Sequence, residues 1–320
     1  MRALIVGGAG FIGSHLARRL LRDERIERLV VYDDLSSGSV AHVAECRNDP
    51  RFELIRGDAK QLEPLASALH GIDVVYHLAA NPDISKAEQQ PDIDFWDGTY
   101  LAQNVLEAMR IQGVKRIFYT SGSGVYGHVP SKVFAEDYGP CLPISTYGAS
   151  KLACEALICA YCHMFGLIGR VFRVANVVGP RQTHGVGYDF IRRLRQDASQ
   201  LRILGNGLQC KSYIHVDDML AALFLVSEKV GDDVAFDVFN VASDDTITVN
   251  EVADLAVDEL GIDKLSVCYM YSGGDRGWKG DTDVLFDVTK IRGLGWRATR
   301  SSSQAMREAL RAMIEELAAC

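Results

Sequence analysis

The N-terminal half of the chain alternates short apolar runs with segments whose apolar residues recur at helical spacing. The apolar runs that predict strands cover residues 2–6, 28–32, 52–56, 74–78, 116–120 and 169–173. The segments that predict helices between them cover residues 14–22, 61–69, 101–111 and 151–165. Strands regularly separated by helices indicate βαβ units, and continuous short apolar runs are typical of parallel strands. The pattern predicts an α/β fold built on a doubly wound parallel sheet.

The pattern changes after residue 176. Glycines and other loop residues interrupt 179–187 and 205–207, and short strands are predicted near 201–204 and 212–216. Helices are predicted over 217–229, 250–260 and 302–318. We therefore expect residues 1–175 to form the sheet domain and residues 176–320 to form mainly a smaller mixed α/β lobe. Some segments of this lobe are expected to return to the sheet.

Composition and charge narrow the function. Of the 320 residues 48% are hydrophobic and 24% charged, and the formal net charge is −8. A negative protein is a poor match for nucleic acid, because binding backbone phosphates needs a basic surface. No apolar stretch approaches the roughly eighteen residues of a membrane span, and no separate targeting segment is expected before the first strand. The eight cysteines include one Cys-x-x-Cys spacing, Cys159 and Cys162, on a predicted helix where thiols behave as small hydrophobes, so we expect a reduced cytoplasmic protein with no metal site.

A glycine-rich turn follows the first predicted strand. Gly7, Gly10 and Gly13 have the spacing G-x-x-G-x-x-G, directly before the helix predicted over 14–22. Glycines at such a turn let the backbone approach a pyrophosphate closely, while the helix N-terminus presents N–H groups and the positive end of its dipole. The turn therefore predicts a dinucleotide-binding site of the Rossmann type.

An acidic pair ends the second predicted strand. Asp33 and Asp34 stand about twenty residues after the glycine turn, where a carboxylate accepts hydrogen bonds from an adenosine ribose. Such a carboxylate would repel a 2′-phosphate, and no arginine stands beside it. The pair favours NAD over NADP as the cofactor.

Tyr147 and Lys151 are the strongest catalytic candidates. Their spacing of four residues places them one turn apart on the same face of a helix. A free phenol, with a pKa of about 10, is a poor base at neutral pH. A neighbouring ammonium favours the phenolate and so lowers the phenol pKa. This pair predicts a tyrosine that acts as a base beside a nicotinamide cofactor.

Further motifs follow in order along almost the whole chain, from Gly7 to about Trp296. They are G-x-x-G-F-I-G over 7–13, Asp-Asp-Leu-Ser-Ser-Gly over 33–38, Gly57-Asp58, His77-Leu78-Ala79-Ala80, Val125-Tyr126-Gly127, Tyr147-x-x-x-Lys151, Arg173-x-x-Asn176-x-x-Gly179-Pro180-Arg181 and Tyr213-Ile214-His215-Val216-Asp217-Asp218. With these motifs the chain resembles the extended short-chain dehydrogenase/reductase family, and within it the NAD-dependent nucleotide-sugar epimerases of the UDP-glucose 4-epimerase type.

The resemblance implies a set of cofactor contacts and gives the second lobe the role of binding substrate. The implied NAD-binding residues are Gly7, Gly10, Phe11, Ile12, Asp33, Asp34, Ser37, Asp58, Ala59, Leu78, Ala79, Ala80, Tyr147, Lys151 and Val174. The implied substrate-binding residues are Ser121, Asn176, Leu204, Lys211, Arg276 and Asp281. The glycine-rich stretch 272–280 also has the composition of a plain surface loop. His77 is interpreted as a buried strand residue rather than a base.

Two glycines depart from the family pattern. Gly122 stands where the resemblance implies a Ser or Thr hydroxyl, and we expect Ser123 to supply it, with Ser121 and Thr120 as alternatives. Gly98 stands where the family commonly has asparagine. Both glycines are expected to widen the site near the reacting carbon. Either the sugar then differs from glucose and galactose, or turnover is impaired.

The resemblance implies an isomerase that epimerises a UDP-hexose, most often at C4, through a transient keto-sugar and NADH. The alternatives are decarboxylation, epimerisation at another carbon, or an impaired NAD-binding protein with a regulatory role. Loss of water is disfavoured, because Ser123-Gly124 replace the Asp-Glu of the family's dehydratases. A homodimer is expected through helices 101–111 and 151–165. The apolar seam would consist of Leu152, Ala156, Cys159 and Ala160.

Overall fold

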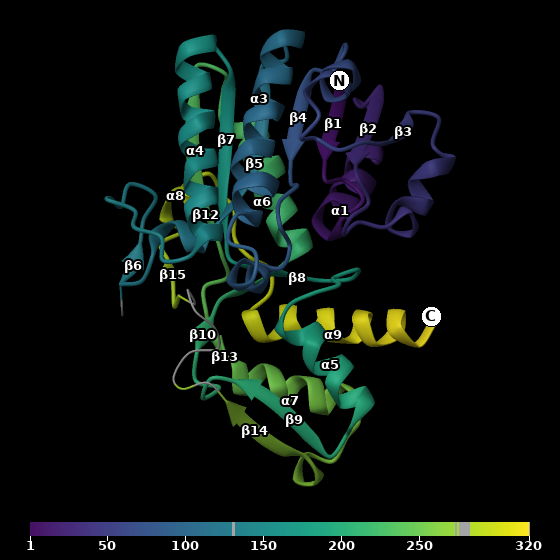
Figure 1. The fold of residues 1–320 in the computed structure, drawn as a ribbon, viewed down its shortest axis with the longest axis vertical. Coiled ribbons are helices and arrows are strands. Elements are labelled where there is room, and N and C mark those ends of the chain that lie inside the picture. Colours follow the sequence, from purple (N-terminus) through teal and green to yellow (C-terminus); the bar gives the residue numbers. More distant parts are fainter. Residues whose placement is uncertain (130–131, 273, 275–281, 320) are drawn as a thin grey trace. The chain divides into compact units, whose positions relative to one another are not determined.

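One seven-stranded sheet gathers strands from residues 2 to 241 of the chain (Figure 1). The structure is a computed structural model and describes residues 1–129, 132–272, 274 and 282–319. The strands lie in the order β12 (Phe236–Val241), β7 (Ile168–Val174), β5 (Arg116–Gly122), β4 (Val74–His77), β1 (Arg2–Val6), β2 (Arg28–Asp33) and β3 (Phe52–Arg56). The pairs from β5 to β3 are parallel. The predicted α/β class with a parallel sheet is confirmed.

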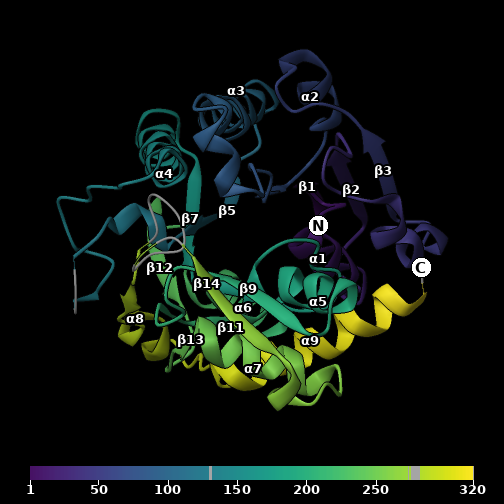
Figure 2. The ribbon, with the colours of Figure 1, turned by 60° about the horizontal axis from the view of Figure 1, so that its bottom comes forward.

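Helices cover both faces of this sheet, as Figure 2 shows for α3 and α4 on one face and α1 and α6 on the other. They are α1 (Phe11–Leu21), α2 (Leu62–Ala68), α3 (Leu101–Gln112), α4 (Thr146–Phe165) and α6 (Val216–Lys229). Shorter turns are η1 (Val40–Asn48), η2 (Ile84–Glu88), the π-helical turn η3 (Phe95–Tyr100) and η4 (Ser123–Tyr126). Because α4 begins earlier than predicted, Tyr147 and Lys151 both lie inside it.

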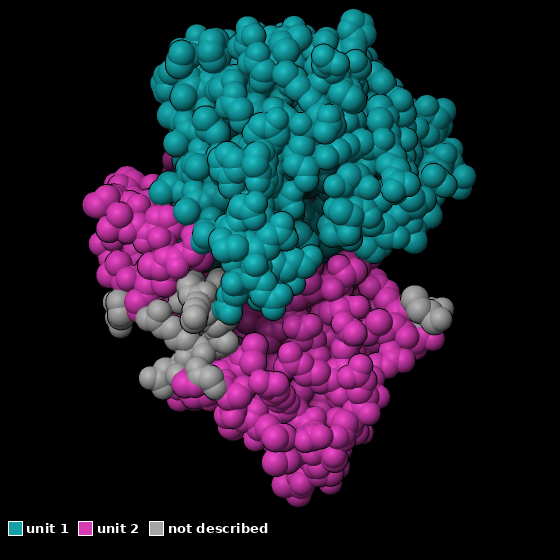
Figure 3. Space-filling view, viewed as in Figure 1, with its two compact units in different colours: residues 1–125, 146–173, 223–239 teal, residues 126–145, 174–222, 240–320 magenta. Residues whose placement is uncertain are grey.

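The chain divides into two compact units, each assembled from three segments (Figure 3). Unit 1 consists of residues 1–125, 146–173 and 223–239, and unit 2 of residues 126–145, 174–222 and 240–320. The core of unit 1 is formed where α2, α3 and α4 pack their apolar faces on the sheet, with Val75, Val105 and Ile117 fully buried. This packing fixes the end of each strand, and the loops that follow the strands carry most of the predicted site residues.

The described residues of unit 2 form four two-stranded sheets. β8 (Asn176–Val178) pairs in parallel with β11 (Tyr213–His215), β9 (Gln200–Leu204) with β14 (Cys268–Ser272), and β15 (Leu285–Phe286) with β6 (Val133–Phe134). β10 (Cys210–Lys211) pairs antiparallel with β13 (Ile247–Thr248). The helical elements are α5 (Val186–Gln196), α7 (Val249–Glu259), η5 (Lys264–Ser266), α8 (Thr289–Gly293) and α9 (Ser302–Ala319). The core of unit 2 lies between α5, α7 and α9. Among the described helices, none combines the length and apolar character that a bilayer span requires.

Candidate active site

The glycine turn is packed too tightly for side chains at two of its positions. Gly7 has φ +81°, and a Cβ there would lie 2.7 Å from the backbone nitrogen of Ala79. A Cβ on Gly13 would lie 2.3 Å from the carbonyl oxygen of Gly7. Helix α1 begins with Phe11, and its cap residue Gly10 offers no side-chain acceptor to the first N–H groups. The predicted contacts Gly7, Gly10, Phe11 and Ile12 therefore surround a helix N-terminus suited to a pyrophosphate.

Asp33 is held against this turn. One carboxylate oxygen accepts a hydrogen bond from the backbone N–H of Ala9 at 2.9 Å, and the other accepts one from Leu35 at 2.8 Å. Burial raises the pKa of Asp33, while these two backbone donors oppose the rise. Each oxygen retains a second lone pair for a ribose hydroxyl. Asp34 is exposed and accepts hydrogen bonds from Ser36. The position of Asp33 thus fits an adenosine ribose without a 2′-phosphate.

The remaining predicted cofactor residues lie at strand ends or in the loops after them. Leu78 and Ala79 follow β4, and both backbone N–H groups donate to the carbonyl of Val6, at 2.9 and 3.0 Å. Four other predicted cofactor residues also follow strands: Ser37 follows β2, Asp58 and buried Ala59 follow β3, and Ala80 follows β4. The fifth, Val174, is the last residue of β7. Most of these residues therefore lie beside the carboxyl edge of the strands.

Helix α4 brings the Tyr147–Lys151 pair together within unit 1. Lys151 is 5% exposed, and its Nζ donates a hydrogen bond to the carbonyl oxygen of Thr120 at 2.8 Å. The same nitrogen lies 5.5 Å from the centroid of the Tyr147 ring. The charge of a buried ammonium acts over such a distance with little screening by water. The pair can therefore hold and return a proton.

The two serines beside Gly122 have different surroundings. Ser121, in β5, is 2% exposed, and its hydroxyl oxygen is buried with no hydrogen-bond partner among the described residues. Alternation along the strand places Ser121 on the same face as Tyr119, whose ring lies 4.9 Å from the Lys151 ammonium. Ser123 is the first residue of η4 and is partly exposed. The backbone carbonyl of Thr120 accepts the hydrogen bond from the Lys151 ammonium.

The structure corrects the expectation for Gly98. This glycine is buried in η3, and a Cβ there would lie 2.2 Å from the hydroxyl oxygen of Ser150 on α4. That hydroxyl donates a hydrogen bond to the carbonyl of Asp94 at 2.7 Å. Ser150 therefore fills the space freed by Gly98, and the missing side chain permits close packing of η3 on α4 instead of widening a site.

The predicted substrate residues of unit 2 are in separate strands. Asn176, exposed at the start of β8, donates its side-chain amide to the carbonyl of Ser212 at 3.2 Å. Leu204 ends β9 and is 42% exposed. Lys211, in β10, donates to the carbonyl of Thr282 and lies 3.7 Å from a carboxylate oxygen of Asp283. Arg276 and Asp281 lie outside the described residues.

The structure adds contacts for three residues, His77, Glu155 and Arg173, of which only the first and last stand in the sequence motifs. His77 is buried as expected, but both of its ring nitrogens lack partners among the described residues. Burial, together with the Lys151 charge, lowers the pKa of His77 to about 3, so the imidazole is neutral. Glu155 forms a buried ion pair with Arg173 at 2.7 Å, so this motif arginine is engaged inside unit 1. Glu155 stands in no motif, and its place one helical turn beyond Lys151 is the signal that could have identified it.

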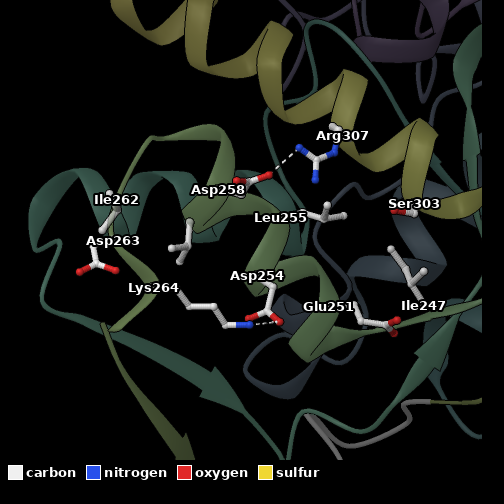
Figure 4. A pocket seen from close by; sticks show the side chains of 11 residues that line it. Ile247, Glu251, Asp254, Leu255, Asp258, Ile262, Asp263, Lys264, Ser303 and Arg307 are labelled. Carbon is white, nitrogen blue, oxygen red and sulfur yellow. Dashed lines mark hydrogen bonds and ion pairs between the residues drawn. The ribbon is translucent and has the colours of Figure 1, made fainter. Parts of the chain in front are cut away.

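Unit 2 also contains a pocket of about 550 Å³ between α7, η5 and α9 (Figure 4). Lys264 pairs with Asp254 at 2.6 Å, and Arg307 pairs with Asp258 at 2.6 Å, as the dashed lines mark. None of its lining residues is a predicted site residue. The pocket is therefore separate from the residues of the candidate active site. Within the described residues, no cluster of three or more His, Cys, Asp or Glu side chains is suited to a metal ion.

Comparison with known proteins agrees with this geometry. The chain is 33% identical to the UDP-glucose 4-epimerase of Mycolicibacterium smegmatis over 74% of this chain and 77% of that protein. A crystal structure of a UDP-galactose 4-epimerase superposes with a TM-score of 0.88, at 35% identity, covering 99% of this chain and 100% of that one.

A double mutant of DesIV, a dTDP-glucose 4,6-dehydratase from Streptomyces venezuelae with NAD and DAU bound, superposes with a TM-score of 0.89 at 29% identity, covering 99% and 98%. Similarity thus extends to both epimerases and dehydratases. The model of the NAD dependent epimerase/dehydratase family matches residues 3–242. The chain therefore belongs to this family of extended short-chain enzymes, which use NAD to transform nucleotide sugars.

Proposed function

We propose that the protein epimerises a UDP-hexose at C4 with NAD as a bound cofactor. The observation that carries this proposal is the Tyr147–Lys151 pair, which stands one helical turn apart on α4 with the ammonium buried. The similarity to enzymes named UDP-glucose and UDP-galactose 4-epimerase supports this choice of nucleotide and carbon.

The proposed chemistry divides between the cofactor and the chain. When bound, NAD would supply the hydride acceptor and donor for the sugar carbon. Tyr147 removes the proton of the sugar hydroxyl and gives it back, and Lys151 stabilises the tyrosine oxygen while it is negative. A hydroxyl of Ser121 or Ser123 donates a hydrogen bond to the same sugar oxygen. Asp33 would hold the adenosine ribose of the dinucleotide, and the glycine turn its pyrophosphate.

The residues after β5 argue against loss of water as the main reaction. Elimination needs an acid and a base beside the sugar, in addition to the tyrosine. In this chain Ser123 and Gly124 occupy the two places after Gly122, and neither carries a carboxylate. Epimerisation requires only the hydride transfer and one proton acceptor, which the Tyr147–Lys151 pair supplies.

The experiment compares the wild type with Tyr147→Phe on a panel of UDP-sugars, using NMR to follow the sugar. We expect wild-type protein to interconvert two C4 epimers and Y147F to lose about a thousand-fold or more of this turnover. Bound NAD, measured by mass spectrometry, should stay unchanged. The matched control is Tyr161→Phe on the same helix, because the Tyr161 hydroxyl instead accepts from Gln103 at 2.6 Å.

Each contrary result has a definite meaning. Full turnover in Y147F would refute the mechanism. A product changed at another carbon, or a loss of carbon dioxide, would assign a different reaction of the family. Unchanged sugars across the whole panel, with NAD bound, would mean that Gly122 marks a catalytically impaired protein with a regulatory role.

We also propose that two copies associate through the outer face of α4. The two oppositely charged residues of this helix, Lys151 and Glu155, are buried, whereas Ala156, Ala160 and Met164 are exposed. The neighbouring turn η3 adds exposed aromatic rings, with Phe95 50% and Trp96 45% exposed. An apolar face of this kind is typical of an interface.

Light scattering after size exclusion tests the dimer. We expect the wild type at twice the monomer mass and Ala156→Arg at the monomer mass, because two arginines cannot be buried at an apolar contact. The control Ala44→Arg places the same charge on exposed residue 44 of η1. A monomeric wild type would refute this proposal.

A further inference from the structure

The Lys151 ammonium is held by strand β5 as well as by its own helix. The ring centroid of Tyr119 lies 4.9 Å from Nζ, inside the range of about 6 Å for a cation–π contact. The next residue of the strand, Thr120, accepts a hydrogen bond from the same nitrogen through its carbonyl at 2.8 Å. Tyr119 itself is 2% exposed, so water does not compete with its ring for the ammonium.

The surroundings of Tyr119 keep this ring fixed and neutral. His77, its partner in the register of β4 with β5, packs against it with ring centroids 5.2 Å apart. Because the pKa of His77 is lowered to about 3, the imidazole adds no competing positive charge at neutral pH. Burial raises the pKa of Tyr119 well above its ordinary value, and the adjacent Cys154 thiol adds to the rise. Tyr119 therefore acts through the face of a neutral ring and not as a second base.

We propose that Tyr119 is a positioning residue that holds the Lys151 ammonium between its own ring and that of Tyr147. This assignment rests on the proposed roles of Lys151 and Tyr147 in turnover of the nucleotide sugar. Lysine has a long flexible side chain with several rotatable bonds, and one hydrogen bond to Thr120 leaves it free to rotate. The ring removes that freedom, so the charge stays 5.5 Å from the Tyr147 ring.

Three variants separate positioning from ordinary core packing. Tyr119→Phe keeps the ring and loses only the hydroxyl, whereas Tyr119→Leu loses the ring. The control Phe118→Leu removes a buried ring from the other face of the same strand, where Phe118 stacks on Tyr76 at 5.1 Å. Y119L and F118L should lose comparable thermal stability, so stability alone cannot explain a difference between them in turnover.

Two measurements are made on the purified protein with its NAD. The first is NMR of the Lys151 methylene protons in lysine-labelled protein, assigned with Lys151→Met. Ring currents should shift these protons upfield in the wild type and in Y119F, and Y119L should lose much of the shift. The second is turnover of the nucleotide sugar. We expect Y119L to lower kcat roughly ten-fold with KM within about two-fold, and Y119F and F118L to stay within about two-fold of wild-type kcat.

Equal kcat values for Y119L and Y119F would overturn the proposal. Lys151 protons without an upfield shift in the wild type, or with the same shift in Y119L, would also overturn it. A wild type that turns over no sugar would instead refute the proposed function. The NMR comparison would then still decide whether Tyr119 fixes the ammonium.

Discussion

Replacement of Glu155 by methionine isolates the energetics of a buried ion pair. The carboxylate accepts hydrogen bonds from Nε of Arg173 at 3.1 and 3.2 Å and from a terminal guanidinium nitrogen at 2.7 Å. The two side chains are only 5% and 7% exposed. Glu155→Met removes the carboxylate that pairs with this buried guanidinium. Such a loss costs about 3–5 kcal/mol, a large part of the roughly 5–15 kcal/mol by which a domain is stable.

The assay is urea unfolding followed by circular dichroism, for E155M, R173M and the double variant E155M/R173M. The double variant should recover most of the loss, because two apolar side chains of similar size require no paired charges. The control is Glu107→Met, which breaks a pair with Arg110 whose side chains are 27% and 44% exposed. That pair should contribute less than about 1 kcal/mol. A cost for E155M as small as that of E107M, or a double variant no more stable than E155M, would refute this account.

Two further predictions follow from the same structure. Gly98→Ala should lower the free energy of unfolding in urea by about 1–3 kcal/mol, because its Cβ would lie 2.2 Å from the Ser150 hydroxyl. Adding Ser150→Ala should restore most of this stability. A G98A variant as stable as the wild type would show that η3 and α4 can separate at no cost. His77 should lower the free energy of unfolding as the pH falls from about 6.5 toward 3, by up to about 1.4 kcal/mol per pH unit. The reason is that His77 binds a proton in the unfolded chain over this range, whereas the folded imidazole, with its pKa of about 3, stays neutral. Unfolding midpoints at pH 7 and pH 5 should therefore differ less in His77→Leu than in the wild type, and equal differences would contradict the burial of a neutral ring.

Periodicity was sufficient to predict most elements of the sheet. The six predicted strands correspond to β1, β2, β3, β4, β5 and β7; β1 and β3 have the predicted ends, and the ends of the others differ by at most two residues. The seventh strand, β12, was missed because it follows the irregular segments of unit 2 and only tertiary packing returns it to the sheet. Helix α5 was missed because Gly185 and Gly187 gave its start the composition of a loop.

The local parts of the candidate site could be predicted and the non-local parts could not. Tyr147 and Lys151 lie on the same face of α4, because residues four apart are about one helical turn apart. The contact of Tyr119 with Lys151 joins β5 to α4, and no spacing rule links these positions. The filling of space at Gly98 by Ser150 depends in the same way on two elements distant in the chain.

The late position of β12 in the chain has a consequence for synthesis on the ribosome. Strand β7 lies between β5 and β12, so until residue 241 has emerged, β7 is the outer strand of an incomplete sheet. Its backbone donors and acceptors then have no neighbour on one side and are open to pairing with another nascent chain. A gene truncated after residue 175 would fix the protein in this unfinished state, and its product should aggregate.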